Sequence, residues 1–209
     1  MTPADTPRRD AQQASRGARR RRHDPQRRDR IIDACLQVLA EHGVAGTSHR
    51  RVAAVAGVPL GSMTYHFTGM DELLREAFTR FTLSVSSTIA QRMAQASTRE
   101  EVAEAISAHI LEDIFDSPRE LVLTHELYTL AAREPAFRAL TNAWMAASRA
   151  ALEQHLDPPT ARMVDALIEG LTIHRALDTE PQDAAVVREA VRRLLPDDRR
   201  APTSAQTPC

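Results

Sequence analysis

Apolar residues recur at helical spacing along most of this chain. Between Ile31 and Leu39 they lie three or four positions apart and stop before Gly43, which predicts one amphipathic helix ending there. Two short helices are predicted next, over residues 48–56 and 59–67. No segment alternates apolar and polar residues as a strand does, so the pattern predicts an all-α protein.

The same spacing continues through the rest of the chain. A long helix is predicted over residues 69–96, where Thr68 and Asp71 have the spacing of a capping box. The next helix opens on a second such box at Thr98 and runs to Ile114. Prolines separate the last four predicted helices, which cover residues 118–133, 136–156, 159–177 and 182–195. The pattern thus predicts about nine helices.

Residues 47–67 have the features of a helix-turn-helix. Ala53 is small enough for the crossing of two helices, and Gly57, four positions later, accepts the positive φ that the turn requires. The apolar residues that would hold the pair together are Val52, Val58 and Met63. The second helix offers short or polar side chains that suit a DNA major groove. A generic pair of packed helices with a glycine turn is the alternative.

Charge is distributed unevenly, although the net charge of the 209 residues is −1. Residues 1–70 hold 12 Arg and 6 acidic residues, whereas the remainder holds 15 Arg and 22 acidic residues. This balance indicates a polyanion partner for the first part alone. The run from Arg19 to Arg22 lies in a polar stretch that we expect to be disordered. One hypothesis places this arm in a DNA minor groove, and the alternative is a solvated tail.

Several functional classes find no support in the sequence. No apolar run approaches the ~20 residues of a membrane span, and the first 24 residues lack the apolar centre of a secretory signal. Cys35 and Cys209 form no disulfide framework, so we expect a cytoplasmic protein without membrane contact. We find no nucleophile–base pair, phosphate-binding loop or paired metal ligands. Enzyme activity, a cofactor and a metal site are therefore not expected.

Residues 27–75 resemble the DNA-binding domain of the TetR family of regulators. The matching features are Thr47 at the start of the second helix, Ala-Gly-Val at the turn, Gly61 on the third helix and Tyr-His-Phe at its end. Beyond this domain the likeness is architectural, with residues 166–171 near the point where the family's dimerisation helices begin. The resemblance implies a sequence-specific transcriptional regulator, a homodimeric repressor that a small-molecule effector releases from a palindromic double-stranded DNA operator. A DNA-binding regulator without a ligand sensor, or an activator, is the alternative.

Carried over by position, the resemblance places the third helix in the major groove. Arg50 then reads a guanine, with an exposed helical charge as the alternative. The residues that face base edges are Leu60, Gly61, Ser62 and Thr64. The residues implied to contact phosphates are Thr47, Ser48, His49, Tyr65 and His66, although packing is an equal alternative for Tyr65. Two positions depart from the family, because Pro59 stands at a usual side-chain cap and Met70 stands near a usual lysine.

The helices after residue 98 are expected to bind the effector and to form the dimer. Candidates to line an effector cavity, with ordinary core packing as the alternative, are Phe115, His125, Tyr128, Thr141, Trp144 and Met145. Candidates for a four-helix dimer interface, some of which would otherwise close the chain's own core, are Met163, Leu167, Gly170, Leu171, Val187, Val191 and Leu194. A tilt of the helix over 69–96 would change the separation of two recognition helices, which must be about 34–36 Å.

The predicted fold is all-α and has four regions. A disordered Arg-rich arm (1–24) precedes a three-helix helix-turn-helix domain (25–70). A helical ligand-binding and dimerisation domain (71–196) follows, and a disordered tail (197–209) ends the chain.

Overall fold

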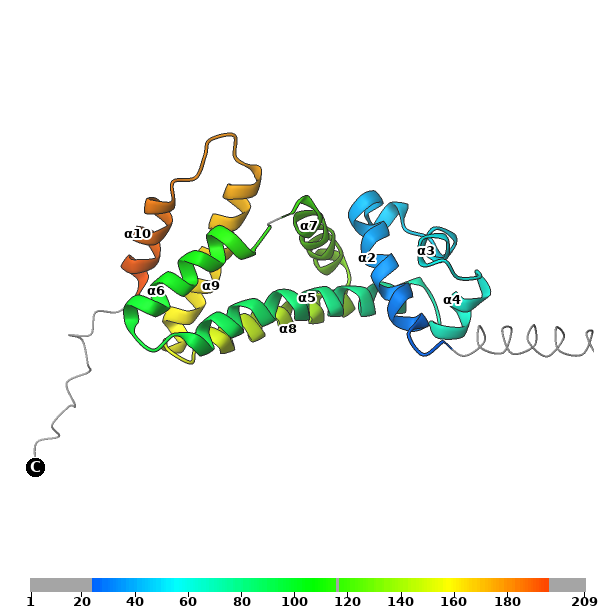
Figure 1. The fold of residues 1–209 in the computed structure, drawn as a ribbon, viewed down its shortest axis with the longest axis horizontal. Coiled ribbons are helices and arrows are strands. Elements are labelled where there is room, and N and C mark those ends of the chain that lie inside the picture. The colour runs from blue at the N-terminus through cyan, green and yellow to red at the C-terminus, as the bar shows by residue number, and fades with distance from the viewer. Residues whose placement is uncertain (1–23, 116, 196–209) are drawn as a thin grey trace, which may run out of the picture.

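The computed structural model describes residues 24–115 and 117–195, and every regular element among them is helical (Figure 1). Most of the predicted arm and all of the predicted tail lie outside the described residues. The first helices are α2 (Arg27–Gly46), α3 (His49–Ala56) and α4 (Gly61–His66). The others are α5 (Met70–Gln95), α6 (Arg99–Ala108), the π-helical turn η1 (His109–Asp113), α7 (Pro118–Arg133), α8 (Pro135–Leu152), α9 (Pro158–Leu177) and α10 (Ala184–Leu194). The prediction of an all-α chain with about nine helices is confirmed for the described part.

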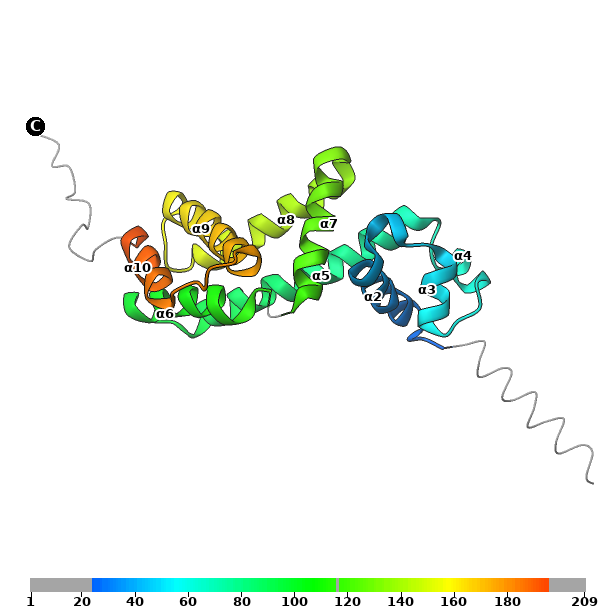
Figure 2. The same cartoon turned by 90° about the horizontal axis from the view of Figure 1, so that it is seen from above.

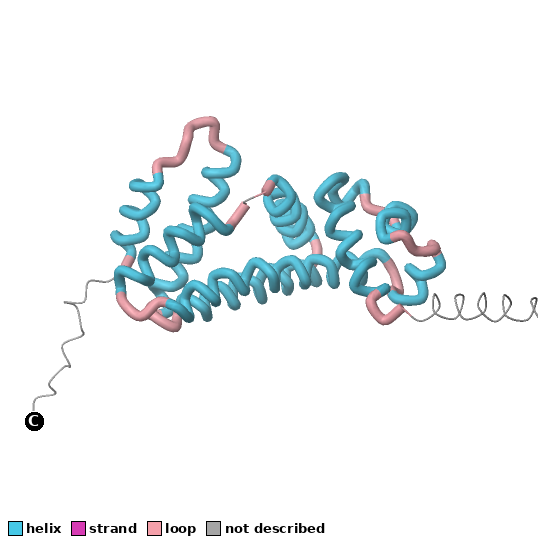
Figure 3. Tube along the Cα trace, viewed as in Figure 1, coloured by secondary structure: helices cyan, strands magenta, loops and turns pink. Residues whose placement is uncertain are grey.

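The helices are arranged along α5, which runs through the middle of the molecule with α8 beside it (Figure 1, Figure 2). α2, α3 and α4 gather at one end of α5, whereas α6, α9 and α10 gather at the other. α7 lies between the two groups and contacts both α2 and α8. Loops and turns join the described helices (Figure 3). The helix-turn-helix pair is therefore carried at one tip of an elongated molecule.

Two clusters of buried side chains hold the helices together. The first joins α2, α3 and α4 to the first half of α5, to α7 and to the start of α8. In its centre the rings of Phe78 and Phe137 meet edge to face with their centroids 6.2 Å apart. The second cluster joins the end of α5 to α6, η1, α8, α9 and α10. Because the first cluster includes Leu123 and Leu127 of α7, the helix-turn-helix domain shares its core with the rest of the chain.

Ion pairs fix the angle between α2 and α5. Arg80 of α5 pairs with Asp29 and, at 2.8 Å, with Asp33 of α2. Arg28 of α2 pairs with Glu76 of α5 at 2.9 Å. Such solvent-exposed pairs contribute at most about 1 kcal/mol each, so they orient the two helices more than they stabilise them.

The start of α5 differs from the predicted capping box. Glu72, rather than Asp71, accepts hydrogen bonds from the backbone N–H of Thr68 at 2.7 Å and from its hydroxyl at 2.6 Å. The reason is that Gly69 is the N-cap, which puts Glu72 at the third helical position. The box predicted at Thr98 is confirmed, with Glu101 as its partner.

Two helix ends also lie elsewhere than predicted. The helix expected to reach Ile114 changes to a π-turn, in which the Ile114 N–H donates to the carbonyl of His109 at 3.3 Å. Phe115 follows with φ +55°, a conformation that is rare for a bulky residue and that ends the helix. α8 ends at Leu152 rather than at residue 156, and His155 donates from Nε2 to the Met93 carbonyl at 2.9 Å.

Gly57 offers a test of the helix-turn-helix geometry. It ends α3 with φ 63° and ψ 35°, and a Cβ added there would meet nothing within 4 Å. Gly57→Ala is expected to lower the free energy of unfolding by about 1–2 kcal/mol through backbone strain alone, which the urea midpoint would report. Gly61→Ala is the matched control, because its Cβ also meets open space and its φ is not positive. Equal midpoints for the two variants would contradict this account.

Candidate nucleic-acid interface and internal cavity

The turn between α3 and α4 is built from backbone hydrogen bonds around Gly57. Ser48 caps α3, since its hydroxyl accepts from the Arg51 N–H at 3.3 Å. The Val58 N–H donates to the Ala53 carbonyl at 3.0 Å, which closes the end of α3. The side chains predicted to hold the pair lie inside, with Val52 and Met63 fully buried and Val58 packed on the same core. The local signals in the sequence thus correspond to the observed geometry.

α3 and α4 expose a continuous set of predicted contact residues. The side chain of Leu60 is 54% exposed and that of Tyr65 is 83% exposed, which is unusual for large apolar residues and typical of an interaction surface. Arg50, Gly61 and Thr64 are exposed beside them. Among the described residues no hydrogen bond or ion pair holds the Arg50 guanidinium. This surface is therefore free to meet a partner.

Other predicted contact residues are partly or fully buried within the chain. Ser62 is only 9% exposed and differs from the expectation that it faces base edges, because the turn at Pro59 directs it toward the core beside Met63. The Thr47 hydroxyl donates to the Gly43 carbonyl at 2.8 Å. His49 is half-buried, and its Nε2 has no hydrogen-bond partner in the described structure.

His66 and Met70 lie at the edge of this surface. Burial, together with the nearby guanidinium groups of Arg27 and Arg28, lowers the pKa of His66 below its usual value, so the imidazole is mostly neutral at pH 7. Met70 packs against the first core cluster, at the position where a lysine was expected from the family pattern. This edge therefore carries less positive charge than the resemblance implies.

An internal cavity of about 60 Å³ lies between α5, α7, α8 and α9. Four of the predicted lining residues line it, namely Phe115, Tyr128, Trp144 and Met145. The Trp144 ring stacks with Tyr128 and meets Phe81 edge on, each at a centroid distance of 6.0 Å. His125 and Thr141 do not line the cavity, because His125 bonds to the Leu121 carbonyl and Thr141 donates to the Arg138 carbonyl.

Part of the cavity wall is acidic. Glu120 of α7 and Asp165 and Glu169 of α9 line it, and none of the lining residues is Arg or Lys. The hydroxyl of Thr124, a 3% exposed lining residue, has no hydrogen-bond partner among the described residues. Asp165 and Glu169 were not among the predicted lining residues, although Asp165, Ile168, Glu169 and Thr172 share one helical stripe. This wall suits a ligand that carries positive charge.

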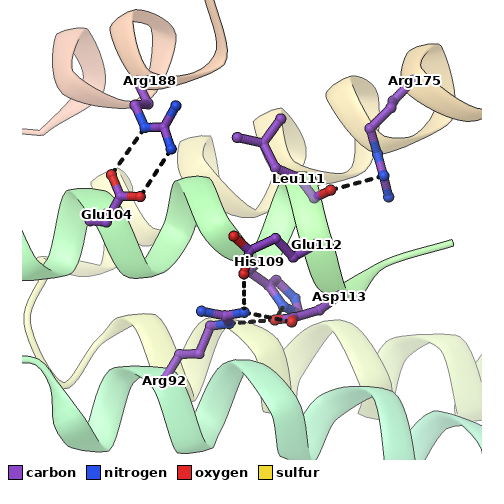
Figure 4. A network of polar contacts seen from close by, with 8 residues as sticks. All are labelled: Arg92, Glu104, His109, Leu111, Glu112, Asp113, Arg175 and Arg188. Atoms are coloured by element: carbon purple, nitrogen blue, oxygen red, sulfur yellow. Dashed lines mark hydrogen bonds and ion pairs between the residues drawn. The ribbon is translucent and has the colours of Figure 1, made fainter. Parts of the chain in front are cut away.

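Figure 4 shows how the π-turn is fixed beside the cavity. Arg92 of α5 donates to Asp113 at 2.6 Å and to Glu112 at 3.0 Å, and the ring of the lining residue His109 contacts Asp113 at 2.9 Å. Arg175 of α9 donates to the Leu111 carbonyl at 2.9 Å. Burial lowers the pKa of His109, although Asp113 opposes the shift. His109 therefore adds little positive charge to the cavity at pH 7.

The predicted dimer residues fall into two groups. Met163 is 49% exposed, Gly170 faces open space, and Leu167, Leu171 and Leu194 are half-buried. Val187 and Val191 are fully buried in the second core cluster. These two residues therefore close the chain's own core, which was the stated alternative to a dimer contact. The described residues contain no cluster of three or more metal-ligating side chains, and none of their helices has the length and apolarity to cross a membrane.

Comparison with known proteins finds two family matches. Residues 31–77 match the family described as bacterial regulatory proteins, tetR family. Residues 97–197 match the family described as tetracyclin repressor-like, C-terminal domain. Together they cover the helix-turn-helix helices and most of the helices that surround the cavity.

Individual proteins are similar along most of their length. SCO7518 from Streptomyces coelicolor A3(2), described as a transcriptional regulator, is 56% identical, with a TM-score of 0.78 over 81% of this chain and 98% of that chain. The multidrug binding protein EbrR in complex with ethidium is 35% identical, with a TM-score of 0.71 over 82% of this chain and 99% of that chain. EbrR structures with imidazole, proflavin and malachite green are also similar. PksA, an HTH-type transcriptional regulator of Bacillus subtilis (strain 168), is 26% identical over 168 residues, 73% of this chain and 80% of PksA.

The acidic cavity predicts a shifted tyrosine titration. Burial and the nearby negative charge of the Glu169 carboxylate raise the pKa of Tyr128 above its usual value. In the Tyr65→Phe variant, Tyr128 is the one tyrosine left. The ultraviolet absorbance change that reports deprotonation of its hydroxyl should occur well above pH ~10. The pKa of Tyr128 is higher in the folded protein than in the unfolded chain. The protonated Tyr128 hydroxyl therefore contributes its full stabilisation of the folded state below pH ~10, and this contribution is lost as the pH rises further.

Adding Glu169→Gln should move the Tyr128 titration to lower pH, and urea-unfolded protein supplies the unshifted reference. A folded Tyr65→Phe protein that titrates like the unfolded chain would contradict the cavity geometry.

Proposed function

The chain belongs to the TetR family of helix-turn-helix transcriptional regulators, and we propose that it is a homodimeric repressor that leaves a palindromic operator when an aromatic cation enters its cavity. One observation carries this proposal. α7 forms a wall of the cavity and also packs against α2 of the helix-turn-helix domain, within one buried cluster. A ligand that moves α7 at the cavity would therefore also move α2, which packs against the DNA-binding helices.

The exposed surface of α3 and α4 is the proposed operator contact. We assign guanine recognition to Arg50, whose guanidinium is free of other described groups, and base-edge contacts to Leu60, Gly61 and Thr64. The residues proposed to contact phosphates are Thr47, Ser48, His49, Tyr65 and His66. Ser62 is left out of this assignment because its side chain is buried.

The exposed apolar part of α9 and α10 is the proposed dimer interface. Met163 and Val186 are 49% and 59% exposed, and Gly170 leaves open space for a closely approaching helix. A two-fold axis through this face would carry the two helix-turn-helix pairs at the outer tips. Each pair could then enter one of two major grooves about 34–36 Å apart.

The proposed effector is an aromatic cation. Trp144 and Tyr128 offer aromatic rings that attract cations, while Glu169 and Asp165 supply negative charge from α9. The partnerless Thr124 hydroxyl is available to a polar group of the ligand. EbrR, at 35% to 37% identity, was solved with ethidium, proflavin and malachite green, which are aromatic molecules with positively charged forms. That similarity supports the same ligand class here.

The size of the cavity determines how ligand binding would be linked to release. Its volume of about 60 Å³ is far below the ~300–1,000 Å³ typical of ligand sites, so a dye-sized ligand must push the walls apart. Two of these walls, α5 and α7, contact α2. A ligand that favours the expanded state shifts the population away from the state that binds the operator.

A DNA-binding regulator without an effector is the second candidate function. The small volume of the cavity favours it, because a solid sensor domain would need no ligand. Whether the protein activates or represses depends on where its operator lies relative to a promoter. That position is a property of the DNA and not of this chain.

Selection of bound duplexes from random DNA tests the proposed function. The purified full chain is expected to enrich an inverted repeat whose half-site centres lie about one helical turn, or a multiple of it, apart. The two-fold symmetry of the dimer is the reason for the symmetry of the site. Enrichment of an unrepeated sequence, or of none at low salt, would refute the proposal.

Arg50→Ala, measured on the selected duplex at fixed salt, should weaken binding by about 1–3 kcal/mol and relax the preference at one base pair per half-site. Arg119→Ala removes the same charge from an exposed position on α7 and should leave the affinity unchanged. An equal loss on every sequence would reassign Arg50 to a phosphate.

Ethidium is the probe for the effector site. Its binding, followed by fluorescence, is expected to weaken operator binding about 5–150-fold, the usual range of allosteric coupling. Glu169→Gln should weaken ethidium binding about tenfold, equivalent to ~1.4 kcal/mol, because it removes a carboxylate from the cavity wall. Glu153→Gln makes the same charge change at an exposed position and serves as the control. Ethidium that binds without changing operator affinity would favour the regulator without an effector.

A further inference from the structure

A carboxylate of α7 occupies a break in α2. At Gly43 the helical path is interrupted, with φ 65° and ψ 178°, which frees the Val44 N–H from its helical acceptor. Glu126 Oε2 accepts a hydrogen bond from this N–H at 3.0 Å, from a position 82 residues further along the chain. A Cβ at Gly43 would lie 2.6 Å from Glu126 Oε1, so glycine permits both the positive φ and the close approach. The break and the carboxylate therefore form one structural unit.

The peptide groups at this break lead directly to the helix-turn-helix. The Thr47 hydroxyl donates to the Gly43 carbonyl at 2.8 Å, and the Thr47 N–H donates to the Val44 carbonyl at 3.1 Å. The next residue, Ser48, is the N-cap of α3. The position of Gly43 and Val44 therefore sets where α3 begins.

On α7, Glu126 lies between two residues that line the cavity. Thr124 and Tyr128 stand two positions before and after it. Successive residues of a helix are about 100° apart, so residues two positions apart point to nearly opposite sides. A ligand that displaces Thr124 and Tyr128 must carry Glu126 with them, because all three belong to one helix.

We infer that Glu126 is a positioning residue that couples the cavity to the helix-turn-helix through the Val44 amide, an inference that rests on the proposed function. A hydrogen bond from a backbone N–H to a carboxylate is short and directional. Displacement of α7 therefore pulls on the peptide at Gly43 and weakens this bond. The route is separate from α5, which is joined to α2 through Asp29, Asp33 and Arg28.

The test compares Glu126→Ala, Glu126→Gln and Thr129→Ala in the full chain. Thr129 is exposed on the same helix and makes none of these contacts, which makes it the matched control. For each variant, the affinity for ethidium is measured, together with the affinity for the selected duplex without and with saturating ethidium. Hydrogen exchange of residues 43–48 is followed in the same two states.

Wild type and Thr129→Ala should show the same coupling, within the usual 5–150-fold range. Glu126→Ala should bind ethidium within about twofold of wild type, while its coupling falls to about twofold or less. Glu126→Gln should keep most of the coupling, because its amide oxygen still accepts the Val44 N–H. In wild type, ethidium should speed exchange of the Val44 amide, and in Glu126→Ala this amide should exchange fast in both states.

Equal coupling in Glu126→Ala and Thr129→Ala would overturn the inference. Unchanged exchange of the Val44 amide in wild type on ethidium binding would overturn it as well, and this measurement does not depend on any variant folding. If ethidium binds and leaves operator affinity unchanged in wild type and Thr129→Ala alike, the effector-release proposal itself fails and the coupling route falls with it.

Discussion

Burial of apolar side chains between α2 and α7 is the constraint on which the rest of the structure depends. Leu123 and Leu127 of α7 lie in the same cluster as Ile31 and Leu39 of α2. Protein interiors are densely packed and compress little, so movement of one of these helices cannot be absorbed where it starts. The hydrogen bond at Val44 and the ion pairs between α2 and α5 set the orientation of α2 within this packing. Apolar packing thus makes this region rigid, and a few polar contacts orient α2 relative to α5 and α7.

The cavity joins two kinds of wall that favour the same ligand. Trp144 and Tyr128 form an aromatic side, whereas Asp165 and Glu169 form an acidic side on α9. Arg149 offsets part of this charge by pairing with Asp165 at 3.3 Å. Glu169 instead lies close enough to Tyr128 for its charge to raise the pKa of that hydroxyl, so the aromatic and acidic sides meet at this point.

The helix-turn-helix could be predicted from sequence because its constraints are local. Gly57 adopts the positive φ that its turn demands, and Val52 and Met63 are buried as their spacing indicates. Burial of Ser62 could not be foreseen, since α4 has only six residues and its register is set by the turn at Pro59. The contact of Glu126 with Val44 joins residues 82 positions apart, a separation that no local pattern reports.

After residue 98 the helices could be predicted from the sequence, but which face of each helix packs in the core or lines the cavity could not. The spacing of Asp165 and Glu169 on α9 is the same for a helix face in solvent and for one that lines a cavity. Only the packing of α9 shows that these residues line the cavity. Val187 and Val191 are core residues because α10 packs on α6 and α9 within the chain. The π-turn also escaped prediction, because Ile106 and Ile110 keep the spacing of a continuous α-helix.

The open space around Gly61 has a consequence for how such a regulator diversifies. Gly61 is the first residue of α4, it lies on the exposed surface, and a Cβ there meets no atom within 4 Å. A side chain introduced by a single codon change therefore leaves the core, the cavity and the contact at Val44 untouched. After gene duplication, two copies could acquire different target sites while answering the same chemical signal.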